Sequence, residues 1–302
     1  MPGESVNDAL IRIAREQLHI ALAEIDDSDL DDHETVHQVR KRCKKLRGLL
    51  RAVRPALGEA YQQENACFRD AARRLSVVRD AQSLVDTLDN LRACYEDSLA
   101  PDFAATLRVR LVRRRDKLAE GEMDLPAQLA QVRAVLRDAH ERAGTWRLDD
   151  EGFAAVAGGL RKTYRRGRKA MINACRDPDA ARFHEWRKRT KYFRFHQRLL
   201  RPLWPGVIKQ QAATASELGD LLGQDHDLGV LQDTLITECA SASANRELQV
   251  LLGLAEQRQL ILRRQARVLG HRLFAEKADA LVARFRGYWS AWEAEQQLPG
   301  KQ

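Results

Sequence analysis

The sequence predicts an all-α protein, and three features of it lead to that fold class. Its 302 residues include only eight prolines and 17 glycines, while residues that lose little on entering a helix, such as Ala, Leu, Arg and Glu, are abundant. Apolar residues recur three, four and seven positions apart, and no useful stretch alternates as a half-buried strand would. One helical pattern is also present twice, so the chain consists of two copies of one helical unit.

The first copy predicts five helices. The spacing of its apolar residues places them near residues 5–25, 33–53, 58–96, 102–120 and 126–142. Gly144 follows the last of these, and Asp149 or Asp150 can cap the helix that comes next. We therefore expect a single domain over residues 1–302, made of repeat one, residues 1–145, and repeat two, residues 150–302. No long linker separates them, so the two copies are expected to pack together.

The second copy follows the first at a constant offset of 147 residues. The segment VHQVRKRCKKLR, which begins at Val36, aligns with FHEWRKRTKYFR, which begins at Phe183. The same offset carries Asp80 onto Asp227, with an Asp-Thr-Leu sequence a few residues after each. The helices of this copy are predicted near residues 151–174, 179–200, 206–238, 244–270 and 272–293.

Positive charge is concentrated in two short segments that this offset aligns. The chain carries a formal net charge of +8, yet residues 36–54 alone contribute +8 and residues 183–201 contribute +6, so the rest of the chain nets −6. A general basic bias would spread the charge along the chain. The distribution instead indicates a binding site for an anionic partner.

Each basic segment forms a helix with two separate faces. Residues three, four and seven apart share a face, so Val36, Val39, Cys43, Leu46, Leu50 and Val53 form an apolar stripe, as do Phe183, Trp186, Phe193 and Leu200 in the repeat. About 100° around each axis lies a row of cations. We call these rows the cation stripes: His37, Arg40, Lys41, Lys44, Arg47 and Arg51 in the first copy, and His184, Arg187, Lys188, Lys191, Arg194 and Arg198 in the second. Like charges one turn apart repel, which suggests an anion that offsets the repulsion.

These motifs resemble the CHAD family, the conserved histidine α-helical domain. The resemblance rests on the paired His-x-x-Arg-basic-x-x-Lys-x-x-Arg helices, the aspartate downstream of each, and the segment GLRKTYRRGRKAM that precedes the second basic helix. It implies two antiparallel bundles of about four main helices each, related by a pseudo-twofold axis around a basic central cavity. It also implies that this cavity binds inorganic polyphosphate.

The resemblance carries over to particular residues of this chain. The two cation stripes become the predicted polyphosphate-binding residues, with Tyr164, Arg165 and Arg168 as secondary candidates. This chain departs from a symmetric pattern at two places. Arg79 stands where the second copy has His226, and the opening helix of the first copy lacks the Tyr-Arg-Arg cluster.

Two other functions compete with polyphosphate binding. A nucleic-acid binder usually adds aromatic stacking platforms, whereas only 6% of these residues are aromatic and most stand at apolar positions. A metal-dependent hydrolase of polyphosphate or phosphoesters could use His226 and Asp227, but the matching pair in the first copy, Arg79 and Asp80, has no histidine. We therefore expect no enzyme, no metal and no cofactor, with Asp80 and Asp227 holding nearby cations in place.

The remaining composition bears on location. Five widely spaced cysteines form no Cys-x-x-Cys pair and fit no disulfide framework, so we expect reduced and mostly buried thiols. No run of 18 apolar residues occurs, and the first residues lack the features of a signal peptide. We expect a cytoplasmic protein without a membrane partner, for which polyphosphate granules are one place of binding.

Overall fold

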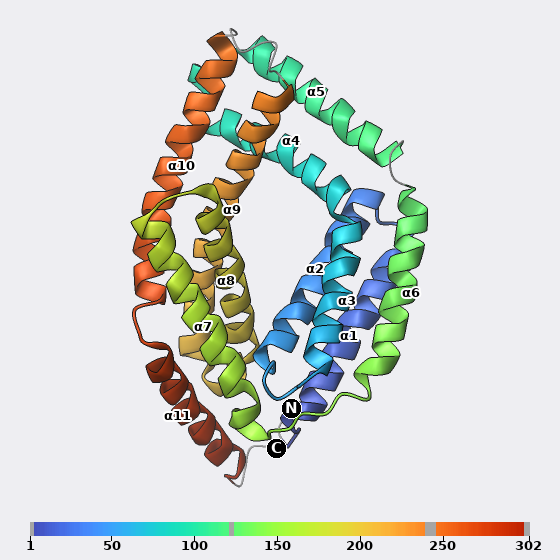
Figure 1. Cartoon of the computed structure of the whole chain (residues 1–302), viewed down its shortest axis with the longest axis vertical. Helices are drawn as coiled ribbons and strands as arrows, with labels where there is room; N and C mark the ends of the chain where they lie inside the picture. Colours follow the sequence, from blue (N-terminus) through green and yellow to red (C-terminus); the bar gives the residue numbers. More distant parts are fainter. Residues whose placement is uncertain (1–2, 121–123, 239–245, 299–302) are drawn as a thin grey trace.

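The computed structural model describes residues 3–120, 124–238 and 246–298, with the side chains of residues 77–80, 97 and 119–120 left out. The described ranges contain helices and no strand, which confirms the all-α prediction (Figure 1). No helix in these ranges combines the length and the apolar character that crossing a membrane requires. The α-helices are α1 (Val6–Asp26), α2 (Asp32–Ala52), α3 (Ala60–Arg74), α4 (Ser76–Cys94), α5 (Pro101–Glu120), α6 (Leu125–Ala143), α7 (Gly152–Arg176), α8 (Ala180–Leu199), α9 (Pro205–Glu238), α10 (Arg246–Leu273) and α11 (Ala278–Gln296).

The first bundle consists of α1, α2, α3 and α6, which pack side by side. Side-chain oxygens start several helices: Asp31 caps α2 by accepting a hydrogen bond from the backbone N–H of Glu34. The predicted apolar stripe of α2 is entirely buried, with Val36, Cys43 and Leu50 at 0% exposure. Periodicity therefore located the buried face of this helix.

The second bundle consists of α7, α8, α9 and α11. Its core is more aromatic than that of the first bundle: Phe183 and Trp186 of α8 are buried, and Phe193 packs edge-on against Tyr164 of α7 with ring centroids 5.1 Å apart. The predicted apolar stripe of α8 is thus also buried. The two basic helices therefore pack into different bundles through their apolar faces.

A separate apolar cluster joins α4 and α5 to α9 and α10 (Figure 1). The sequence predicted one helix over residues 58–96, and that prediction is wrong. The helix breaks at Leu75, whose side chain is 0% exposed in the core of the first bundle. The break lets α3 pack on α2 while α4 packs on α5 and α9. By contrast α9, with 34 residues, runs unbroken through both apolar clusters.

Two smaller expectations also need correction. The last helix begins at Ala278 rather than near residue 272, because the chain turns at Phe274, which is buried in the main core. The cysteines Cys43, Cys67, Cys94 and Cys175 are free, as expected, but Cys94 is exposed; Cys239 lies outside the described residues. Of these four thiols only Cys43 is fully buried, so the expectation of mostly buried thiols is wrong.

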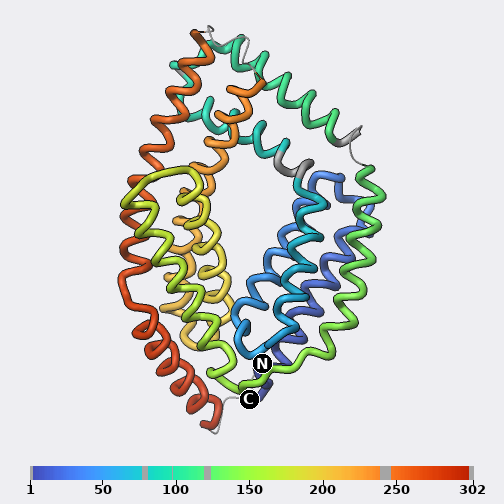
Figure 2. The backbone as a smooth tube through the Cα atoms, in the orientation of Figure 1, coloured from blue at the N-terminus to red at the C-terminus, as the bar shows by residue number. Residues whose placement is uncertain are grey.

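The bundles touch where α2 crosses α7 and α8. At Gly48 of α2 an added Cβ would come within 2.6 Å of the ring of Phe195 on α8. His196 lies beside this contact, and its Nε2 donates a hydrogen bond to the Gly48 carbonyl at 3.2 Å. From this crossing the backbones of the two bundles diverge, and α4, α5, α9 and α10 join them again at the far end (Figure 2).

Candidate functional site: two facing rows of cations

The crossing of α2 and α8 brings the two cation stripes close to each other. Lys44 of α2 and Lys191 of α8 stand one helical turn before Gly48 and Phe195, the residues at the contact. The Lys191 side chain is exposed at the surface, yet the protein atoms around it, followed by the charges of Arg187 and Lys44, lower its pKa to about 8. A lysine on one helix therefore acts electrostatically on a lysine of the other.

Two glycines of α9 lie against the α8 stripe. Gly223 lies beneath the guanidinium of Arg187, and Gly219 lies beneath the aliphatic chain of Lys191; a Cβ there would be 3.5 Å and 3.9 Å from those atoms. Two glycines in a helix interior cost about 1 kcal/mol each relative to alanine. Their spacing of four residues places both glycines on one face of α9, a feature that the sequence prediction did not include.

Histidines and an aspartate complete this wall. Arg187 lies 3.7 Å from Asp227 of α9, the kind of contact that the sequence predicted for that aspartate. The rings of His184 and His226 lie 4.3 Å apart. Burial, together with the charge of Arg187 and the ring of His184, lowers the pKa of His226 to about 4, so this imidazole is neutral at physiological pH.

Other members of the stripes are held by neighbouring helices. On the α2 side, Arg40 donates to the Ala72 carbonyl at the end of α3 at 2.5 Å, and Arg47 Nε donates to Asn65 Oδ1 at 3.3 Å. On the α8 side, Arg194 donates to Ser216 at 2.7 Å. These hydrogen bonds to neutral acceptors help to fix the positions of the guanidinium groups.

The rest of the stripes is more varied. Lys41 and Arg198 are exposed, His37 is half-buried, and Lys188 pairs with Glu185 of its own helix. The Arg51 guanidinium lies 3.9 Å from the centre of the Tyr192 ring on α8. The residues of each stripe therefore share one face of their helix, but Lys188 and Arg51 already interact with other groups.

The three secondary candidates do not join this site. Tyr164 is 0% exposed, and its hydroxyl donates to backbone carbonyls of Leu273 and Glu276, so its prediction as a ligand-facing residue is wrong. Its ring fills the aromatic core that α7 shares with α8. Arg168 donates to the Phe274 carbonyl at 3.2 Å, and Arg165 is exposed on α7. The side chain of Asp80 lies outside the described residues.

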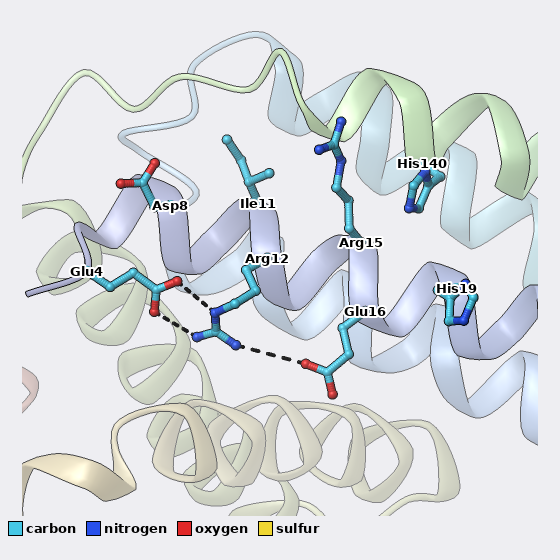
Figure 3. A pocket seen from close by; sticks show the side chains of 8 residues that line it. All are labelled: Glu4, Asp8, Ile11, Arg12, Arg15, Glu16, His19 and His140. Carbon is cyan, nitrogen blue, oxygen red and sulfur yellow. Dashed lines mark hydrogen bonds and ion pairs between the residues drawn. The ribbon is translucent and has the colours of Figure 1, made fainter. Parts of the chain in front are cut away.

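A broad surface depression lies elsewhere and has a different charge. About 610 Å³ in volume, it lies along α1 with His140 of α6 at one edge (Figure 3). Its arginine Arg12 is held by Glu4 at 2.7 Å and reaches Glu16 at 4.0 Å. Its lining contains three acids, Glu4, Asp8 and Glu16, and two arginines, so this depression lacks the excess positive charge that an anionic chain needs.

Ligands for a metal ion do not gather in the ranges that the structure describes. There, no three His, Cys, Asp or Glu side chains lie together as a metal ion would require. His226 and Asp227 are neighbours of Arg187, whose positive charge opposes a second cation. The chemistry that this arrangement supports is the binding of anions.

Comparison with known proteins agrees with these features. A model of one protein family, described as CHAD domain, matches residues 12–236, a range that contains both cation stripes. No curated protein matches the chain. Because the family model covers well over half of the sequence, the chain belongs to the CHAD domain family.

Proposed function

We propose that this protein binds inorganic polyphosphate without breaking it down, and that the two cation stripes form the binding surface. The observation that carries the proposal is that α2 and α8 touch at Gly48 and Phe195, one helical turn beyond Lys44 and Lys191. Two helices from different bundles direct cations at one space, although like charges repel and the arrangement costs free energy without a ligand. Membership of the CHAD family is consistent with a ligand related to polyphosphate.

The chemistry of the ligand fits these side chains. Polyphosphate is a flexible chain with about one negative charge per phosphate, so a row of cations can follow a row of anions. Arginine offers two parallel N–H donors to phosphate oxygens, and lysine offers a compact charge. Each phosphate that finds a cation also removes repulsion within the stripes, so a long chain should bind more tightly than a short one.

We also propose that the two repeats are related by a pseudo-twofold axis through the helix crossing. Gly48 and Phe195, which touch, stand at positions separated by the sequence offset of 147, and so do Lys44 and Lys191. Contacts between matching positions are what a twofold axis produces. Such an axis would place the ligand between equivalent faces of repeat one and repeat two.

Competition distinguishes this function from nucleic-acid binding. Labelled polyphosphate bound to the protein would be challenged with single-stranded DNA, RNA and ATP at one salt concentration. We expect unlabelled polyphosphate to displace the label at far lower concentration than any of the three. Displacement by RNA or DNA at equal phosphate concentration would instead favour a nucleic-acid binder.

A second measurement addresses hydrolysis. We expect no release of phosphate from polyphosphate on prolonged incubation, with or without magnesium or manganese. Metal-dependent release that is lost on changing His226 and Asp227 to alanine would assign the protein to the hydrolases and refute a binding-only role. The cytoplasm, and polyphosphate granules within it, are where we propose that binding takes place.

A further inference from the structure

A second concentration of positive charge lies on another side of the same helix crossing. Here the end of α2 meets α7 and α8 around a small cavity of about 20 Å³. Five of the residues that line it are basic, and we call them the basic pocket: Arg51, Arg54, Lys162, Arg166 and Arg189. Only Arg51 also belongs to a cation stripe.

The pocket is distinct from the stripe of α8. At about 100° per residue, Arg189 stands roughly 160° around the helix from Lys191, and Tyr192 stands about 100° from it. Arg189 is 8% exposed, and its Nε donates to Glu185 at 2.6 Å. The stripe and the pocket therefore use different faces of one helix.

Acids do not balance the charge of the pocket. Among the described residues, Glu185 is the one carboxylate that forms an ion pair with a pocket residue, and it is shared with Lys188. Carbonyls at the end of α2 also attract cations, but a helix end supplies only about half a negative charge. Several positive charges are left over in a partly enclosed space.

The titration behaviour of the pocket agrees with this imbalance. Burial, followed by the charges of Arg54, Arg166 and Arg165, lowers the pKa of Lys162. Burial and then the charge of Arg189 lower the pKa of Arg166. No carboxylate is among the groups that act on Lys162, so it is surrounded by charges of its own sign.

The two repeats differ in charge at matching positions. Arg189 of the pocket is matched by Arg42, 147 residues earlier, which is paired with Glu24 at 2.6 Å. Gly159 of the pocket wall is matched by Arg12, which is paired with Glu4 at 2.7 Å, and Arg166 is matched by His19. Duplication of the helical unit therefore does not reproduce the same set of charges.

We infer that the basic pocket is a separate site for a single phosphate group, either that of a small inorganic phosphate or the terminal group of a polyphosphate chain. Its volume leaves room for little more than a water molecule, so a nucleotide base is excluded. Phosphate oxygens can enter once the side chains at its rim, the exposed Arg166 and the half-buried Arg54, move aside and then close on them. Three or more guanidinium groups then supply charge-assisted hydrogen bonds.

Calorimetry with pyrophosphate and with polyphosphate tests this site on the full chain. The pocket variant is Lys162→Gln with Arg166→Gln. Its matched control, with the same loss of charge from the same helix, is Arg161→Gln with Lys169→Gln; both of these residues are exposed, and Arg161 has only a surface ion pair with Asp279. Circular dichroism checks that each variant is folded.

We expect the pocket variant to bind pyrophosphate at least about tenfold more weakly than the wild type and the control, which identifies a site for a free phosphate. If pyrophosphate binds none of the proteins, a loss of polyphosphate affinity that is greater for short chains than for long ones identifies a site for chain ends. This second outcome rests on the proposed function, because it requires that the protein binds polyphosphate.

The inference is overturned if the pocket variant and its control behave alike toward both ligands. Failure of the proposed function would look different. In that case Lys44→Gln with Lys191→Gln would leave the affinity for long polyphosphate unchanged, whatever happens to pyrophosphate at the basic pocket.

Discussion

Gly159 of α7 lies directly against the backbone carbonyl of Ala52 on α2, and a Cβ at residue 159 would be 1.9 Å from that oxygen. This is closer than any side chain allows, and backbone cannot swing away as a flexible side chain can. The contact fixes the distance between the two bundles next to the crossing of α2 and α8.

Gly159→Ala is therefore expected to lower the free energy of unfolding by at least about 2 kcal/mol, despite the better helix propensity of alanine. Gly253→Ala is the matched control, because residue 253 is an exposed helical glycine with no atom within 4 Å of an added Cβ. That variant should be stabilised, by up to about 1 kcal/mol. Urea unfolding measures both, and equal effects would show that α7 does not press on α2.

His196 makes the stability of this crossing depend on pH. Burial lowers the pKa of His196 to about 4, so folding requires the neutral ring, while the unfolded chain protonates it near pH 6.5. Stability is therefore complete above pH 6.5 and falls as the pH drops toward 4. Between pH 7.5 and pH 5 the loss due to this residue should be about 2 kcal/mol.

His196→Gln separates this effect from the other histidines, because glutamine keeps a donor for the Gly48 carbonyl but does not titrate. The variant should lose less stability than the wild type between the same two pH values, by about that amount. Urea unfolding at both pH values provides the comparison. Parallel losses in the two proteins would mean that the buried ring carries no such penalty.

Polyphosphate binding should also respond to pH, through Lys191. The pKa of this lysine is lowered to about 8 in the free protein, and a bound anion would raise it. Binding therefore takes up a proton near pH 8, and affinity falls as the pH rises through 8 toward the ordinary range of a lysine. Calorimetry at pH 8 in buffers of different ionisation enthalpy detects the uptake. Lys191→Arg stays charged, so it should show a smaller uptake and a flatter pH profile; an unchanged profile would exclude Lys191 as the source.

The sequence predicted those features of the fold and the site that depend on the helical period. Stripes three and four residues apart identified both the buried face of α2 and the row of cations beside it, because one helix fixes the phase of both. The break at Leu75 was not predictable in this way. It depends on α3 and α4 having different partners, and those partners are far away in the sequence.

Residue identity alone misled at two other places. Tyr164 stands in a basic segment, yet its ring completes a core that only the packing of α7 on α8 creates. Arg189 stands outside both stripes by helical phase, yet it lines the basic pocket. That pocket combines residues of three helices, and no single helical pattern contains it.

The central claim is that two stripes from different repeats hold one ligand, and the affinity for long polyphosphate at fixed salt tests it most directly. Lys44→Gln with Lys191→Gln removes one cation from each stripe, and Arg161→Gln with Lys169→Gln removes the same charge from an outer surface. We predict at least a tenfold loss of affinity for the stripe variant, about the value of one charge-assisted contact, and a loss below about twofold for the control. Equal losses in the two variants would contradict the account, because the protein would then attract polyanions by its net charge alone.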